Sequence, residues 1–79
     1  MGIFVHILSS RKYMTILEKL NQEYDEVLLK YEKLEVFISS EDFGELEKLQ
    51  KSLLKRQLNV LGSYLNILAS RIKLLEKEQ

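Results

Sequence analysis

Residues 46–75 read LEKLQKSLLKRQLNVLGSYLNILASRIKLL, and this stretch decides the fold. Its apolar residues recur at alternating steps of four and three, the repeat that keeps one face of an α-helix against a partner helix. A first stripe is formed by Leu54, Leu58, Leu61, Leu65, Leu68, Ile72 and Leu75. A second stripe beside it contains Leu46, Leu49, Leu53, Val60, Ile67 and Leu74. One neighbouring helix cannot cover both stripes, so the pattern predicts one partner within the chain and another outside it.

An earlier segment shows the same helical repeat. Its seam positions are Leu17, Leu20, Tyr24, Val27, Tyr31, Leu34 and Ile38. Thr15 and Glu18 have the spacing of a capping box, in which two side chains satisfy the backbone donors of a helix start. The segment therefore predicts a long helix that starts at about residue 15.

The only credible break between the two helical segments is SSEDFG at residues 39–44. Ser40 followed by two acidic residues is a good helix N-terminus, because its hydroxyl caps free amides and carboxylates favour the positive end of the dipole. We expect Phe43 to fold back against Phe37 or Ile38. A reversal in about five residues forces the two helices to lie antiparallel.

These patterns predict an all-α fold, an antiparallel two-helix hairpin of coiled-coil type that assembles into a homo-oligomeric helical bundle. The expected parts are a helical or irregular N-terminal arm at 1–13 and a hairpin at 14–79, with helices at about 15–39 and 45–77 and a turn at 40–44. A chain of 79 residues without cysteine has a small core and no disulfide to reinforce it, which favours oligomerisation. We expect the second stripe to be the oligomer interface.

Composition excludes several classes of protein. Twelve basic and twelve acidic residues give zero net charge, which argues against binding to a nucleic acid polymer. The chain has no cysteine and only one histidine, His6, so we expect no metal site. The apolar run at 1–8 is too short to cross a bilayer and lacks the features of a secretory signal, so we expect no membrane partner. No catalytic motif is present, and we expect neither an enzyme nor a cofactor.

Polar groups interrupt the helical seams. Gln57, Tyr64 and Arg71 fill the remaining places of the second repeat, while Tyr24 and Tyr31 lie in the seam of the first helix. One interpretation is structural: these groups satisfy one another or a neighbouring subunit and fix the register. The other is a pocket between protomers, where tyrosines stack on a base and an arginine grips phosphate. The candidate ligand-binding residues are Tyr24, Lys30, Tyr31, Arg56, Gln57, Tyr64 and Arg71.

Gly62 stands inside the second predicted helix, where glycine costs about 1 kcal/mol relative to alanine. It belongs to a strip of small or polar residues, namely Asn59, Gly62, Asn66, Ala69 and Lys73. Either a neighbouring group approaches closely here, or the strip is an ordinary exposed face with one tolerated glycine.

A family resemblance rests on a pattern along both helices. The matching residues are Glu23-Tyr24, Lys30-Tyr31-Glu32-Lys33-Leu34, Phe37-Ile38, Ser40, Phe43, Leu46, Leu53-Leu54, Gln57-Leu58, Leu61, Tyr64, Ile67-Leu68 and Arg71-Ile72. Over about residues 14–75 the chain resembles very short phage and prophage proteins related to a small protein of crAss-like phages. It departs from them at Glu47, where a serine or proline is often found.

The resemblance implies a phage or prophage accessory protein in the cytoplasm of a bacterial host. Small helical-hairpin phage proteins include sponges that sequester cyclic oligonucleotides of CBASS systems or ADP-ribose-derived signals of Thoeris systems. The predicted function is therefore an anti-defence protein that binds itself and a small nucleotide immune signal, without catalysis. The alternative is a helical protein–protein interaction module that inhibits a host protein or serves as a phage structural accessory.

Overall fold

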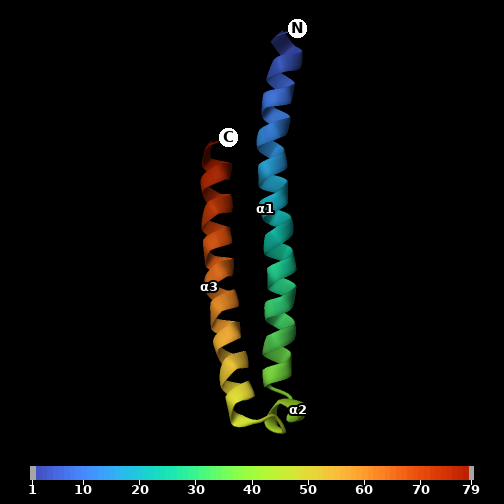
Figure 1. Ribbon diagram of the computed structural model, residues 1–79. Helices are drawn as coiled ribbons and strands as arrows, with labels where there is room; N and C mark the ends of the chain where they lie inside the picture. Colours follow the sequence, from blue (N-terminus) through green and yellow to red (C-terminus); the bar gives the residue numbers. More distant parts are fainter. Residues whose placement is uncertain (1, 79) are drawn as a thin grey trace.

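The computed structural model describes the backbone of residues 2–78 and the side chains of residues 15–78. The chain forms α1 (Gly2–Ile38), a single turn α2 (Glu41–Gly44) and α3 (Lys48–Glu78). Figure 1 shows α1 and α3 lying antiparallel, side by side, with α2 at the end where the chain reverses. The molecule is a rod of 64 × 17 × 15 Å. The predicted all-α antiparallel hairpin is confirmed.

The first helix begins earlier than the capping box at Thr15 predicts. α1 is continuous from Gly2, so the helix passes through Thr15 and Glu18. A capping box lowers the cost of a helix end but does not require one, and Arg11, Lys12 and Met14 just before it are good helix formers. The first turns of α1 project beyond the C-terminal end of α3 (Figure 1). Of the two expectations for residues 1–13, the backbone from Gly2 onward adopts the helical one.

Two serines end α1 and start α2. The Ser39 hydroxyl donates to the carbonyl of Glu35 at 3.3 Å, and the Ser40 hydroxyl donates to the carbonyl of Phe37 at 2.6 Å. The Ser40 oxygen also accepts a hydrogen bond from the backbone N–H of Phe43 at 3.4 Å, as the predicted N-cap should. The serines therefore satisfy backbone groups on both sides of the turn.

Phe43 fills the end of the hairpin. Its ring is buried and meets the ring of Phe37 edge-on, with centroids 6.2 Å apart and planes at 89°. The Nζ atom of Lys55 lies 5.8 Å from the centroid of the same ring, so a residue of α3 closes over it. The predicted contact with Phe37 is confirmed.

α3 starts at Lys48, three residues later than the predicted residue 45. The backbone N–H of Glu45 donates to Asp42 O and that of Leu46 to Phe43 O, so these residues complete the turn of α2. Glu47, the position of the family departure, is the residue directly before α3.

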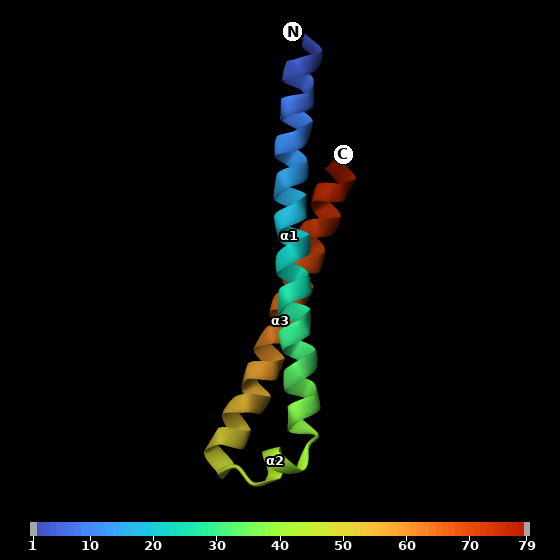
Figure 2. The ribbon, with the colours of Figure 1, turned by 90° about the vertical axis from the view of Figure 1, so that its right-hand side faces the viewer.

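The core lies between α1 and α3, on the side away from the turn. Its buried members are Leu17, Leu20, Val27, Leu65, Leu68 and Ile72. Leu68 is the centre, with 0% of its surface exposed. All seven residues of the first stripe are buried or half-buried, which confirms that this stripe faces α1. Figure 2 shows the two long helices crossing, so that α3 lies on one side of α1 near α2 and on the other side at its C-terminal end.

The glycine in α3 has a close neighbour. A Cβ atom built on Gly62 would lie 3.3 Å from Cε2 of Tyr31, a ring that packs against the core. The absence of a side chain at residue 62 thus lets the tyrosine ring of α1 lie against the backbone of α3. The sequence left two interpretations of the strip of small and polar residues on this helix. At Gly62 the structure shows the first one, in which a neighbouring group approaches closely.

Candidate functional site

The second stripe of α3 is mostly exposed. Leu49 and Val60 are 69% and 67% exposed, and Leu53, Ile67 and Leu74 are exposed as well. Leu46, next to the turn, is half-buried. The hairpin therefore covers one stripe of α3 and leaves the other uncovered, as the sequence predicts. Exposed aliphatic residues in register along a helix suggest a partner, and the expected interface between copies stays a prediction.

Three polar residues alternate with these aliphatic ones. Gln57, Tyr64 and Arg71 are exposed and recur every seven residues, each between two aliphatic positions of the second stripe. Tyr64, at 36% exposed, is the least open of the three. From Leu53 to Leu74 the polar and aliphatic residues together form a continuous face, called the outer seam below. It contains Leu53, Gln57, Val60, Tyr64, Ile67, Arg71 and Leu74.

The remaining candidate residues lie apart from the outer seam. Tyr24 and Tyr31 are half-buried and pack against the core cluster. Lys30 on α1 and Arg56 on α3 are exposed. Within one chain the structure thus separates the predicted set into two tyrosines between the helices and five residues directed to solvent.

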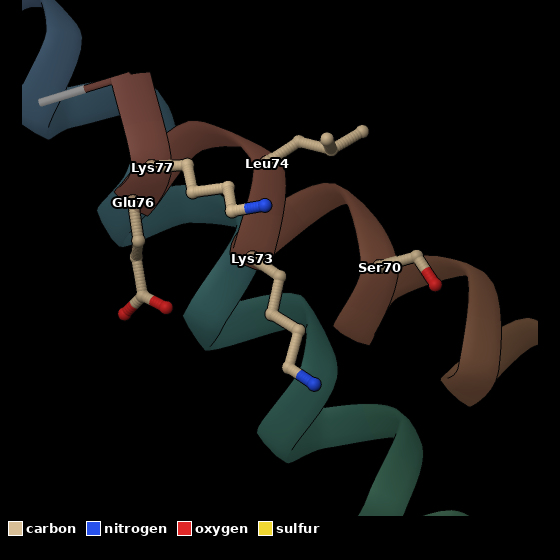
Figure 3. A pocket seen from close by; sticks show the side chains of 5 residues that line it. All are labelled: Ser70, Lys73, Leu74, Glu76 and Lys77. Carbon is tan, nitrogen blue, oxygen red and sulfur yellow. The ribbon is translucent and has the colours of Figure 1, made fainter.

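A shallow hollow lies near the C-terminal end of α3. It is lined by Ser70, Lys73, Leu74, Glu76 and Lys77. In Figure 3, the side chains of Leu74 and Glu76 point in different directions, and the Lys73 side chain extends away from both. None of the seven predicted ligand-binding residues lines this hollow. Leu74 connects it to the outer seam.

Sequence reasoning missed three exposed apolar residues on α1. Ile16, Leu29 and Val36 are exposed, and Val36 is 70% exposed. Leu29 and Val36 are seven residues apart and interrupt the charged face of α1. That spacing was visible in the sequence, but the stronger seam from Leu17 to Ile38 concealed it.

Two further observations concern the described part of the chain. No group of three or more His, Asp or Glu side chains there is placed to hold a metal ion. Over the same residues, neither long helix contains an apolar stretch sufficient to cross a membrane.

Comparison with protein families gives a match over most of the chain. The family described as Sequestin matches residues 12–74, which include most of α1, all of α2 and α3 as far as Leu74. The chain belongs to the Sequestin family. The Sequestin region contains the buried core cluster and the whole outer seam. No curated protein and no solved structure matches the chain.

Proposed function

We propose that this chain sequesters a small nucleotide immune signal without catalysis, as a phage or prophage anti-defence protein in the cytoplasm of a bacterial host. The observation that carries the proposal is the exposed series Gln57, Tyr64 and Arg71 among the aliphatic residues of the outer seam. The family name Sequestin, which suggests sequestration, supports a binding role over a catalytic one.

The spacing of two of these residues suits a nucleotide. Tyr64 and Arg71 lie seven residues apart on one face of α3, which is about 10 Å along the helix. An aromatic ring can stack on a base, and a guanidinium can grip phosphate with two parallel hydrogen bonds. A cyclic oligonucleotide or an ADP-ribose derivative presents both groups at this separation. The site therefore selects for a base and a phosphate in one molecule.

Self-assembly would enclose such a site. On a single chain the outer seam is open to solvent, where stacking and ion pairing are weak. The five exposed leucine, isoleucine and valine residues of the second stripe would each contribute about 1 kcal/mol if a partner covered their exposed halves. The sum of about 5 kcal/mol per copy matches the stability of a whole small domain. A homo-oligomer through the second stripe is thus part of the proposal.

Calorimetric titration tests the proposal. The ligands are a panel of cyclic dinucleotides, cyclic trinucleotides and ADP-ribose derivatives. We expect one class to bind the wild type and Arg71→Ala to abolish that binding, with oligomer mass and thermal midpoint nearly unchanged. Lys73→Ala is the matched control, because Lys73 is an exposed cation of the same helix outside the outer seam.

A different result of the titration would favour protein binding as the function of this chain. If no ligand of the panel binds the wild type and Arg71→Ala melts at a much lower temperature, Arg71 is structural and the nucleotide proposal is wrong. The exposed Ile16, Leu29 and Val36 favour that second candidate, a module that inhibits a host protein or joins a phage assembly. Native mass spectrometry of the protein purified from infected, defence-active cells separates the two, since a sponge should carry its ligand.

A further inference from the structure

We infer that the outer seam of α3 docks on the outer seam of a second copy, with the two α3 helices antiparallel about a twofold axis at the height of Gly62. The partner is a second copy because the exposed face has the steps of four and three that a helix of the same pitch recognises. The core stripe, which has the same steps, already packs against a helix in this way.

Charge selects the antiparallel orientation. In a parallel, in-register pair, Arg71 would face the partner's Arg71 across the seam. Residues 48–62 carry four basic and no acidic residues, whereas residues 63–78 carry three basic and two acidic ones, a net charge of three minus two. A parallel pair would place four positive charges opposite four. An antiparallel pair places the four positive charges of residues 48–62 opposite the net charge of plus one on residues 63–78 of the partner. The two helix dipoles then also point in opposite directions, which is favourable.

The register follows from the alternation of aliphatic and polar places. Residue 62 of one helix then lies level with residue 62 of the other. In this register the numbers of any two residues that face each other add up to 124. Leu53 then faces the partner's Arg71, Gln57 faces the partner's Ile67, and Val60 faces the partner's Tyr64. Each layer joins one aliphatic side chain to one long polar side chain, whose stem covers the aliphatic surface while its polar tip lies at the edge of the interface. This register uses the full length of α3.

The same register completes the proposed ligand site, a step that rests on the proposed function. Within one chain, Gln57 lies beyond Tyr64, about 21 Å along the helix from Arg71. In the pair, the partner's Gln57 lies level with Ile67, between Tyr64 and Arg71. Two equivalent sites result, each with Tyr64 and Arg71 from one subunit and Gln57 from the other.

Cysteine cross-linking of the full chain without ligand tests the pairing, because the natural chain has no cysteine. Gln50 and Leu74 are exposed and fall in one antiparallel layer. Under mild oxidation, a mixture of Gln50→Cys and Leu74→Cys should form a mixed disulfide dimer, whereas each variant alone should not. In the antiparallel pair the two copies of residue 50 lie about 36 Å apart, and a disulfide needs Cα atoms within about 7 Å.

Lys73→Cys is the matched control, since residue 73 lies at the height of Leu74 but outside the outer seam. Its mixture with Gln50→Cys should cross-link at least tenfold less. A disulfide dimer of Gln50→Cys alone would show parallel pairing and overturn the inference. Equal cross-linking in the control mixture, no cross-linking in any mixture, or a monomeric mass by light scattering would also overturn it. None of these outcomes depends on nucleotide binding, which the titration on wild type decides separately.

Discussion

α3 carries two stripes of similar composition, of which the first packs against α1 and the second is mostly exposed. Leu65 and Leu68 of the first stripe are buried against α1, while Leu53 and Leu74 of the second are exposed. The residue types are the same, so hydrophobicity alone does not decide which stripe the hairpin covers. The position of α1, fixed by the short reversal at α2, covers the first stripe only. A helix with two such faces is suited to one partner inside the chain and another outside it.

Truncating the first stripe should have the largest effect. Leu68→Ala leaves a cavity at the centre of the core, and we expect a loss of about 3–5 kcal/mol in the free energy of unfolding. Denaturant melts at one fixed protein concentration measure it, because an oligomer's stability depends on concentration. Leu74→Ala is the matched leucine on the outer seam and should lower the stability of the single hairpin by less than about 1 kcal/mol. Equal losses in a monomeric background would mean that the two stripes are not distinct.

Changing the second stripe should affect assembly and not the hairpin. Replacement of Leu53, Val60 and Ile67 by glutamine leaves the core untouched, because all three are exposed. We expect a monomeric mass at low micromolar concentration with nearly unchanged helical circular dichroism. Replacing Leu29 and Val36 on α1 in the same way controls for general loss of apolar surface. If that control dissociates the assembly and the α3 variant does not, the interface lies on α1.

Mixed subunits would sharpen the role of the outer seam in binding. Gln57→Ala and Arg71→Ala should each bind poorly alone, because each removes one member of every shared site. A mixed dimer of the two variants keeps one complete site, so an equimolar mixture should regain about one quarter of the wild-type binding capacity. The measurement is titration with the member of the nucleotide panel that binds wild type. No recovery on mixing would place both residues in the same subunit's site.

A smaller effect is expected at the contact between α1 and α3. Gly62→Ala gains helix propensity, and its new methyl group requires the Tyr31 ring to move by a few tenths of an ångström. Because Tyr31 is only half-buried, we expect its ring to yield and the variant to be more stable by under about 1 kcal/mol. Gly44→Ala is the control, as a Cβ there meets nothing within 4 Å. A lower melting temperature for Gly62→Ala alone would show that Tyr31 is held rigidly.

The smallest effect should follow removal of residues 1–13. The first turns of α1 extend past the end of α3, and the described core starts at Leu17. A chain that begins at Met14 should therefore stay folded, with a thermal midpoint within a few degrees of the full chain. Loss of solubility or of most helicity would mean that residues 1–13 belong to the core or to an interface.

The sequence predicted the hairpin because its main signals agree. The four-and-three repeat identified the faces of both helices, and Ser40 and Phe43 marked the reversal. It misjudged the start of α1, since a capping signal such as Thr15 can lie inside a continuous helix. The candidate site was harder, because Tyr24 and Tyr31 share the seam repeat with core residues. Periodicity identifies a face, but it does not distinguish a tyrosine that packs against the core from one that is free for a ligand.

The position of the core, away from the turn at α2, has a consequence for folding. The buried cluster joins residues 17–27 to residues 65–72, so the tightest packing lies farthest from the reversal along the chain. The chain must close a long loop before these stabilising contacts can form. The entropic cost of closure increases with loop length. The α2 turn brings the two helices into approximate alignment, but the rate of folding should depend on the distant ends meeting. We expect amide exchange to be slowest around Leu68 and faster near Phe43, although Phe43 is closer to the turn.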